Sequence, residues 1–412
     1  LTVDTGERRP LTTPPRNSLG DSGVAISPDG RTLAFIRNPT YMVTDIYLAP
    51  LSGGEPTRLT FDNRIIVGLA WTPDGREIVF SSNRSGPGSL WRVSASGGKP
   101  VGLPEAGEGV AFPTIARQGR RLVFSRTTDD TNIWGIELAG PGASESGPVQ
   151  LTSSTRADGS PQLSSDTKRV TFSSDRSGKG EIWACDREGT NFVQLTFSGG
   201  SPGTPRWSPD GQQIAFDSRA RGDPDIYVVG SQGGSPRQLT SDPSEDVVPS
   251  WSRDGRWIYF ASNRTGEFQV WKAPAEGGTA VQVTKGGGFA AFESLDGKSV
   301  YYAKSRSVPS IWRVPVEGGE EVLVLESPRP ANWSYWTLAK DGIFLVDRPE
   351  AGDPAFLKFF HLATRRTTRI ATLDKFARNP GAGLTASADG RWVLYTRLDQ
   401  HNTDLMLIEN FR

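Results

Sequence analysis

The stretch Trp207-Ser208-Pro209-Asp210-Gly211, followed by the strand-like segment 213–216, is the clearest copy of a unit that recurs along the whole chain. Its proline restricts φ at the first turn position, its aspartate can accept hydrogen bonds from nearby backbone, and its glycine tolerates the left-handed conformation that closes a hairpin. The stretch therefore predicts a strand that ends at the tryptophan, a tight turn, and a second strand that follows at once.

Nine such turns divide the chain at a regular spacing. Counted from Asp29, the steps between them are 45, 44, 48, 44, 44, 42, 45 and 48 residues. A period of about 40–45 residues with four strands per repeat is typical of β-propeller blades, which stack radially because one blade cannot bury its own faces. Two copies are degenerate, Gln118-Gly119 and Asp166-Thr167. The intact copies are Asp29-Gly30, Asp74-Gly75, Asp210-Gly211, Asp254-Gly255, Asp296-Gly297, Asp341-Gly342 and Asp389-Gly390.

Each repeat divides into four strands, here named a to d. In the clearest copy, strand a ends at residue 207, strand b covers 213–216, and strand c covers 225–229 with β-branched and aromatic residues. A Gly-Gly turn at 233–234 then leads into the outer strand d at 236–240. Helical periodicity is absent, so the chain is predicted to be all-β.

The two ends of the chain are expected to close the ring. The last set of strands, at about 384–409, contains a, b and c but has no strand d after it. Residues 5–13 match the turn and strand d of the other repeats and have no strands a and b before them. Pairing these segments would remove two exposed sheet edges. We therefore predict one domain, 1–412, built as a closed propeller of nine four-stranded blades. Eight blades remain the alternative, with a weaker copy at 104–150 or 328–380 misassigned.

Composition excludes several classes of function. Lys+Arg and Asp+Glu number 46 each, and no basic stripe stands out, so direct binding of nucleic acid by this segment is not expected. No stretch approaches the length of a membrane span, so no membrane insertion by the segment is predicted. The single cysteine, Cys185, rules out an internal disulfide and a cysteine-based metal cluster. No motif for a cofactor is present.

Catalytic constellations are also missing from the sequence. A serine hydrolase needs a base, usually histidine, and the chain has only His361 and His401. Neither belongs to a Gly-x-Ser-x-Gly motif, and two histidines 40 residues apart do not indicate a zinc site. The prediction is a protein that is not an enzyme and that has no metal site.

An arginine at the end of strand b or in the b–c loop recurs in every repeat. If these side chains converge on the mouth of a channel, they form an anion-selective funnel that binds a ligand. The other interpretation is structural: each arginine braces its own hairpin or the next blade by bonding loop carbonyls and the acid that begins strand c. The set comprises Arg37, Arg84, Arg126, Arg176, Arg219, Arg264, Arg306, Arg348 and Arg397.

The eighth repeat departs from the consensus. It is rich in aromatic residues, including Trp333 and Trp336, and has a longer b–c loop at 348–354. Since blade stacking does not require this irregularity, we rank the repeat first as a ligand or partner surface.

The Ser-Pro-Asp-Gly turns and the loops 81–86, 173–178 and 261–266 resemble the TolB-like branch of WD-type propellers. The resemblance covers about residues 5–410. It implies the propeller fold, and it implies function weakly, because these blades occur in periplasmic TolB, in prolyl-oligopeptidase-like and tricorn-like peptidases, and in sensor regions of CadC-like winged-helix regulators. The final segment 404–412 looks most like the end of the last group.

The resulting expectation is a non-enzymatic sensor. Its propeller would recognise a small molecule, peptide or protein on the b–c face or in the channel, as a monomeric part of a larger periplasmic regulator with an upstream membrane anchor. Two alternatives stay open. One is a TolB-like periplasmic scaffold for protein interactions, and the other is the propeller of a prolyl-oligopeptidase-like peptidase that lacks its hydrolase domain.

Overall fold

The computed structural model describes residues 9–411 apart from 17, 41–42, 62–63, 119, 140–146, 307–309, 327–332, 348–353 and 378–382. Strands make up nearly all of its regular structure, and the one helix among these residues is the short 3-10 helix η1 (Pro104–Ala106). The prediction of an all-β chain is confirmed. No helix in the described ranges has the length and apolar character required to cross a membrane.

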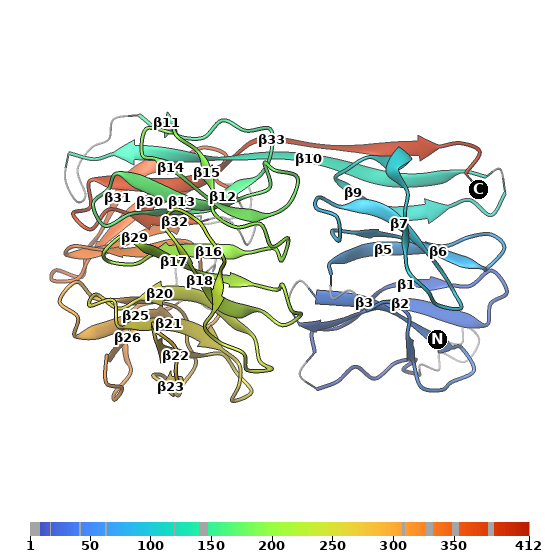
Figure 1. Ribbon diagram of the computed structural model, residues 1–412, viewed down its shortest axis with the longest axis horizontal. Helices are drawn as coiled ribbons and strands as arrows, with labels where there is room; N and C mark the ends of the chain where they lie inside the picture. Colours follow the sequence, from blue (N-terminus) through green and yellow to red (C-terminus); the bar gives the residue numbers. More distant parts are fainter. Residues whose placement is uncertain are drawn as a thin grey trace. The chain divides into compact units, whose positions relative to one another are not determined.

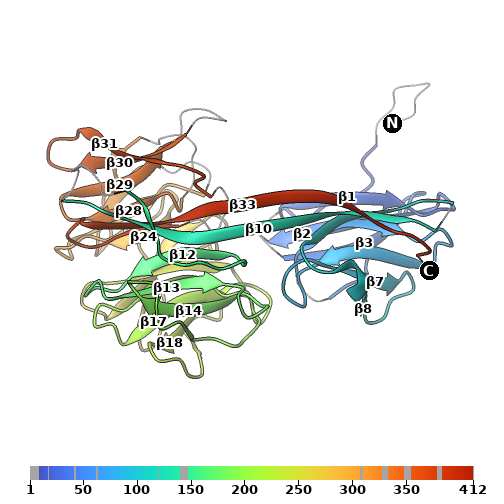
Figure 2. The same cartoon turned by 90° about the horizontal axis from the view of Figure 1, so that it is seen from above.

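The chain forms two compact units (Figure 1). Unit 1 contains residues 1–128 and 401–412, and unit 2 contains residues 129–400. The boundary falls within two long strands, β10 (Leu122–Glu137) and β33 (Trp392–Ile408). These strands are hydrogen-bonded neighbours and run side by side in Figure 2. Each long strand therefore contributes one part to each unit.

Unit 1 contains three sheets. The third is formed by β9 (Val110–Ile115), the first part of β10 and the last part of β33. Apolar clusters join the first sheet to the second and the second to the third. The first sheet consists of β1 (Gly20–Ile26), β2 (Thr32–Thr40), β3 (Val43–Pro50) and β4 (Thr57–Arg58), and the second of β5 (Ile66–Trp71), β6 (Glu77–Ser82), β7 (Ser89–Ser94) and β8 (Val101–Gly102).

Unit 2 contains six sheets of four strands in the order a-b-c-d. The sixth combines β32 (Leu384–Ala386), β33, β10 and β11 (Val149–Gln150). The other five are β12 (Asp158–Leu163), β13 (Arg169–Ser174), β14 (Glu181–Asp186) and β15 (Val193–Gln194); β16 (Gly203–Trp207), β17 (Gln213–Ser218), β18 (Asp225–Gly230) and β19 (Arg237–Gln238); β20 (Asp246–Trp251), β21 (Trp257–Ser262), β22 (Gln269–Pro274) and β23 (Val281–Gln282); β24 (Phe289–Glu293), β25 (Ser299–Ala303), β26 (Ile311–Pro315) and β27 (Val322–Leu325); β28 (Trp336–Ala339), β29 (Gly342–Asp347), β30 (Ala355–His361) and β31 (Thr367–Leu373).

Apolar side chains pack each sheet of unit 2 against the next. Five buried clusters join the first sheet to the second and so on to the sixth. A further cluster brings Leu394 of β33 against Val170 and Phe172 of β13, which joins the sixth sheet to the first. The six sheets therefore pack in a cycle, with strands a innermost.

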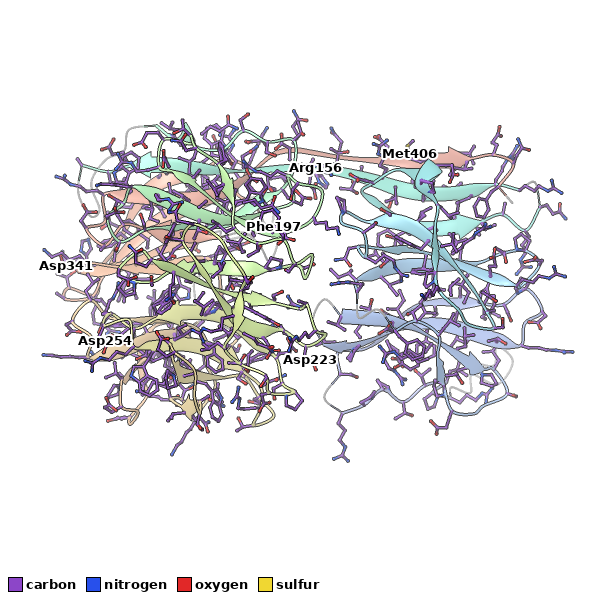
Figure 3. All side chains as sticks on the ribbon, viewed as in Figure 1. Arg156, Phe197, Asp223, Asp254, Asp341 and Met406 are labelled. Carbon is purple, nitrogen blue, oxygen red and sulfur yellow. The ribbon has the colours of Figure 1, made fainter. Side chains whose placement is uncertain are left out.

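The a–b turns follow the predicted chemistry. Ser252 Oγ donates a hydrogen bond to Asp254 Oδ1 at 2.6 Å, and the same oxygen accepts the Arg256 N–H at 3.0 Å. The bond from Ser252 lowers the pKa of the Asp254 carboxyl. Gly255 has a φ of 71°, as the turn requires. Figure 3 shows Asp254 and Asp341 at one end of unit 2 and the b–c loop residue Asp223 at the other.

Two turns depart from the Asp-Gly pattern. In the degenerate copy, Thr167 takes the left-handed conformation with a φ of 59°. At Asp341-Gly342 the left-handed residue is Asp341 itself, with a φ of 66°, and Ala339 pairs with Gly342 across a two-residue turn. Gly119 of the other degenerate copy lies outside the described residues.

The expected nine separate blades in one ring require correction. The third and ninth repeats share β10 and β33. These strands join the third sheet of unit 1 and the sixth sheet of unit 2 into one hydrogen-bonded sheet, so the nine repeats form eight sheets in total. The b–c segments 126–131 and 397–403 contain no glycine or proline, unlike the other b–c loops, and the chain continues through them as strand. This signal was present in the sequence, because an extended backbone remains available where no turn residue interrupts it.

The proposed closing strand also differs. Residues 9–13 form no strand, and residues 5–8 of the expected segment lie outside the described part. In unit 2, β33 pairs with β10, and β11 is the outer strand. Most outer strands have only two residues, so a match to the strand d pattern is too short to specify its partner.

A threonine two residues after each of five outer strands, β4, β11, β15, β19 and β23, accepts a backbone N–H of strand c and so links strands c and d. Thr284 is fully buried, and its Oγ1 accepts the Val270 N–H at 2.9 Å while donating to Gln269 Oε1 at 3.0 Å. Replacing Thr284 with valine should lower the free energy of unfolding by about 1–3 kcal/mol, because the buried Val270 N–H loses its acceptor and Gln269 Oε1 keeps only the Gly287 N–H as a donor. Urea denaturation measures the loss, and Thr284→Ser, which keeps the hydroxyl, should lose clearly less. Equal stability of the valine variant and the parent would contradict this role.

Candidate functional site

Most of the recurring arginines stack on aromatic rings of their own sheet. The guanidinium carbon of Arg264 lies 4.7 Å from the ring centroid of Trp271, and Arg84 lies 4.8 Å from that of Trp91. Three of the set also pair with the acid that opens strand a of the same sheet. These pairs are Arg37–Asp21 at 2.8 Å, Arg176–Asp158 at 2.7 Å and Arg264–Asp246 at 2.8 Å.

Other members of the set have different surroundings. Arg126 and Arg397 lie within the continuous strands β10 and β33 instead of in loops, and Arg126 is exposed. Arg348 lies outside the described residues. The remaining ion pairs are Arg219–Asp217 at 4.0 Å, Arg306–Glu245 at 3.3 Å and Arg397–Asp399 at 3.1 Å.

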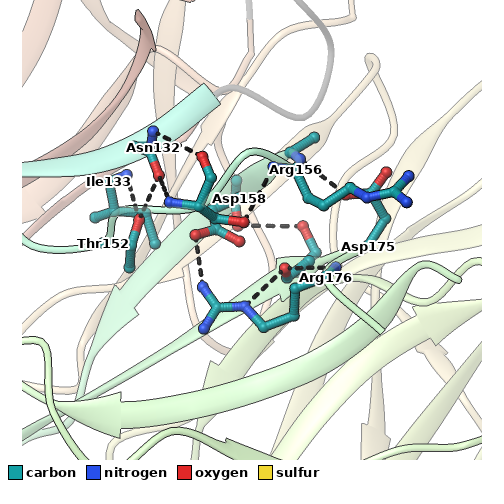
Figure 4. Close-up of polar contacts among 12 residues, drawn as sticks. Asn132, Ile133, Thr152, Arg156, Asp158, Asp175 and Arg176 are labelled. Atoms are coloured by element: carbon teal, nitrogen blue, oxygen red, sulfur yellow. Dashed lines mark hydrogen bonds and ion pairs between the residues drawn. The ribbon is translucent and has the colours of Figure 1, made fainter. Parts of the chain in front are cut away.

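These contacts are structural, as the bracing interpretation predicts, but the acid that pairs with the arginine is a different one. The sequence suggested the acid that begins strand c, whereas the three closest pairs use the acid that begins strand a. Figure 4 shows one case, in which Arg176 reaches Asp158 while its Nε donates to a neighbouring hydroxyl, Ser174 Oγ, at 3.2 Å. Each such arginine ties the end of strand b to the start of strand a.

Loss of one brace should destabilise the fold. The Asp246 side chain is fully buried, and Arg264→Met would leave its carboxylate without a cationic partner. The free energy of unfolding should fall by about 3–5 kcal/mol, since breaking a buried pair leaves an uncompensated charge. Arg126→Met, the same change at an exposed member of the set, should shift it by about 0.5 kcal/mol or less. Urea denaturation compares the two, and equal effects would refute the bracing role.

Asp225, at the start of β18, has no arginine partner. Its carboxylate accepts hydrogen bonds from Gln238 Nε2 at 2.9 Å and Thr240 Oγ1 at 3.2 Å. Burial, together with the nearby Asp246 carboxylate, raises the pKa of Asp225 to about 6. At the equivalent position β3 carries Asp45, which pairs with Arg58 at 2.6 Å.

Because the folded pKa of Asp225 exceeds the unfolded value, its contribution to stability is present below about pH 4 and is lost as the pH rises through about 6. Asp225→Asn should therefore gain stability relative to the parent between pH 4.5 and pH 7. Asp45→Asn should lose stability at pH 7, because it removes one charge of an ion pair. Urea denaturation at the two pH values provides the test, and a constant difference for Asp225→Asn would exclude the effect.

One cavity among the described residues of unit 2 lies on the axis of its six sheets. It has a volume of about 140 Å³ and opens among the a–b turns, beside Ser164, Pro209 and Arg253. A smaller pocket continues from it and shares Arg206, Phe292 and Leu384. Together they are lined by residues from or next to all six inner strands. We call the two pockets the channel site.

Of the ligand-binding residues predicted from the sequence, only the two tryptophans of the eighth repeat line the channel site. Trp333 and Trp336 line the smaller pocket, and Trp336 packs edge-on against Phe292 with ring centroids 5.0 Å apart. No member of the arginine set within the described ranges lines either pocket. The site therefore opens on the a–b side, whereas the sequence directed attention to the b–c side.

Inner strands carry a bulge that the sequence did not reveal. The pairing of strand a with strand b shifts within β12, β16, β20 and β24. The bulged residues have positive φ although they are not glycine: Ser160 (50°), Thr204 (45°), Val248 (55°) and Ala290 (48°). Positive φ costs energy in such residues, most of all in β-branched ones, so only the tertiary environment can hold it.

Arg206 of β16 is the residue of the channel site that sequence reasoning missed. It follows the bulge, lines both pockets and sits near the ring of Phe292 at 5.8 Å. Its Nη1 donates to the Pro205 carbonyl at 2.9 Å, while its buried Nε has no hydrogen-bond partner. Burial lowers the pKa of Arg206 to about 10, so the side chain remains charged at neutral pH.

A second arginine in the cavity is compensated. Arg253 donates its backbone N–H to Glu293 Oε1 at 3.0 Å and its Nη2 to the Glu293 carbonyl at 3.1 Å. The other carboxylate oxygen of Glu293 accepts the Tyr259 hydroxyl at 2.7 Å. Burial lowers the pKa of Arg253, and the Glu293 charge opposes this shift.

The two histidines lie elsewhere. His361 ends β30 with its ring 4.6 Å from that of Phe359, and His401 is exposed in β33. Neither lines the channel site. In the described ranges, no three His, Cys, Asp or Glu side chains gather closely enough to hold a metal ion.

The repeated antiparallel sheets and Asp-Gly turns define a repeat protein of the β-propeller type. The family model described as TolB beta propeller domain matches residues 2–144 and 199–385, so the chain belongs to this family. The predicted resemblance to TolB-like propellers is confirmed.

Known relatives match parts of the chain. An uncharacterised protein of Agrobacterium fabrum is 34% identical over 100 residues, which are 24% of this chain and 33% of that protein. The Tol-Pal system protein TolB of Anaeromyxobacter dehalogenans is 34% identical over 114 residues, which are 27% of this chain and 24% of that protein. The chain thus spans about a quarter to a third of the curated relatives it matches.

A solved structure supports the fold. The putative TolB from Agrobacterium tumefaciens superposes with a TM-score of 0.54 at 19% identity, covering 66% of this chain and 99% of that chain. At this identity the likeness concerns the fold alone.

Proposed function

We propose that the protein is a non-enzymatic binding module that holds its ligand in the channel site of unit 2. The observation that carries the proposal is a cavity lined from all six inner strands, among which buried polar groups have no hydrogen-bond partner. Unused donors in a cavity are costly without a ligand or water, so their presence supports binding.

The groups around the cavity support binding over catalysis. Both carboxylate oxygens of Glu293 are already occupied by donors. The thiol of Cys185 lies in an apolar cluster where burial raises its pKa to about 12. Four hydroxyls of the cavity donate to turn aspartates and so are held as structural groups: Ser164 to Asp166, Ser208 to Asp210, Ser252 to Asp254 and Ser387 to Asp389.

We place this module outside the cytoplasm, as the monomeric sensor part of a larger regulator similar to CadC-like proteins. Membership of the TolB beta propeller family and the resemblance of residues 404–412 support this setting. The second candidate is a scaffold that docks a protein partner at the channel mouth, favoured by the similarity to a Tol-Pal system protein. An upstream winged-helix domain and membrane span would support the sensor, and a signal peptide alone the scaffold.

A plug in the cavity tests whether it is the binding site. Thr385 of β32 lines the cavity at the strand position equivalent to Arg206, so Thr385→Trp places an indole in it. A library of random tripeptides serves as the probe, and the melting temperature is the readout. A ligand at about five times its Kd stabilises the parent by about 1 kcal/mol, which raises the melting temperature by roughly 2–4 °C. The plugged variant should show no increase.

Ala220→Trp is the matched control at the opposite end of unit 2. Ala220 is exposed beside the b–c loop, so its variant should respond to the tripeptides as the parent does. The reverse result, in which Ala220→Trp abolishes the response and Thr385→Trp does not, would place the binding site on the b–c face and overturn the proposal.

A further inference from the structure

The chemistry of the channel site indicates what kind of group it binds. This inference rests on the proposed function and makes it more specific. We propose that the channel site of unit 2 binds a carboxylate, with Arg206 as its cationic anchor. The carboxylate is carried either by a small organic acid or by the C-terminus of a peptide.

The charge inside the channel site is not balanced. Its ionisable lining groups among the described residues are Arg206, Arg253 and Glu293. The Glu293 carboxylate accepts the Arg253 backbone N–H and the Tyr259 hydroxyl, and its charge acts on the Arg253 guanidinium. One positive charge, on Arg206, therefore has no carboxylate in the cavity.

The acid outside the cavity that acts on Arg206 is Asp217, and its carboxylate already has other partners. Asp217 is the charged group that opposes the lowered pKa of Arg206. Its Oδ2 accepts hydrogen bonds from Thr204 Oγ1 and from the Val248 N–H, and its Oδ1 lies 4.0 Å from Arg219. A buried cation without a partner is costly, and a ligand anion would remove that cost.

Neutral donors near Arg206 point to the same kind of ligand. The buried Trp207 Nε1, Trp336 Nε1 and Ser250 Oγ have no hydrogen-bond partner, although these residues are at most 6% exposed. Two tryptophans at the position equivalent to Trp207 are satisfied: Trp251 Nε1 donates to the Arg206 carbonyl at 3.0 Å, and Trp71 Nε1 donates to the Ala25 carbonyl at 3.1 Å. Because indoles only donate, a ligand with acceptor oxygens would satisfy these groups.

The size of the cavity limits what can enter. About 140 Å³ corresponds to the space of four or five waters at about 30 Å³ each. This holds a carboxylate with a few carbon atoms, but not a folded domain. Guanidinium and carboxylate groups form strong charge-assisted pairs, so a chain end or a small acid that reaches Arg206 suits the site.

The test uses the complete chain and four probes. The tripeptide N-acetyl-Ala-Ala-Ala and its C-terminal amide differ only in the carboxylate, while propionate and propionamide represent the free acid and its neutral analogue. Binding is followed by calorimetry and by the fluorescence of the channel tryptophans. At least one acid should bind the parent about tenfold or more tightly than its amide, as expected for hydrogen bonds to charged groups.

Variants of Arg206 test whether the preference for the acid over the amide depends on this residue. Arg206→Met should remove the preference for the acid, and Arg206→Lys, which keeps the charge, should retain part of it. The fold is not expected to suffer, because Arg206→Met removes a buried charge without a carboxylate partner, and the urea midpoint checks this. If the tripeptide acid binds and propionate does not, the source is a peptide terminus; the reverse result indicates a free acid.

The two proposals can fail separately. If acid and amide bind the parent equally and Thr385→Trp abolishes both, the channel site is confirmed and the carboxylate proposal falls. If Arg206→Met leaves the preference for the acid unchanged, Arg206 is not the anchor. If none of the four probes binds the parent at 10 mM, an upper limit of roughly the weak millimolar range, the carboxylate proposal also falls.

Discussion

Face-to-face packing of small twisted sheets is the constraint on which the rest of this structure depends. A four-stranded sheet has two faces, and β17 buries apolar side chains on both: Ile214 and Phe216 on one face and Ala215 on the other. Such a sheet is stable only between two others. In unit 2 six sheets meet this need in a cycle, and the cycle creates an axis lined by the innermost strands. The channel site is thus a consequence of how the core is buried.

Arginine serves two opposite purposes in this framework. Arg264 pairs with Asp246 and stacks on the ring of Trp271, so its charge stabilises a single sheet. Arg206 has the same side chain but no such partner, and it lies where the six sheets meet. The difference follows from position. At the b–c end, strand a begins with an acid next to the arginine, whereas on the axis the neighbouring groups belong to other blades.

Much of the local structure was predictable from the sequence, and the sequence also held a signal for one feature that was missed. The turn chemistry of Ser252 and Asp254 was read correctly, because the contacts that define it lie within a few residues. The continuous strands β10 and β33 were missed, although the lack of glycine and proline in 126–131 and 397–403 was a usable signal. The irregular context of Trp333 and Trp336 marked them as candidates, but it did not predict that they lie on the axis. Arg206 carried no signal, since one arginine in a strand resembles any other.

The sequence by itself determined the all-β class, the period of the repeat and the chemistry of each turn, because these depend on neighbours within one blade. Tertiary structure decided how many sheets form, which strands are shared between two units, and which polar groups are left without partners. The physical reason is that a two-residue outer strand pairs equally well with several edges, and that burial of a charge depends on six segments far apart in the chain. The bulge at Val248, with its positive φ, depends on the same distant contacts.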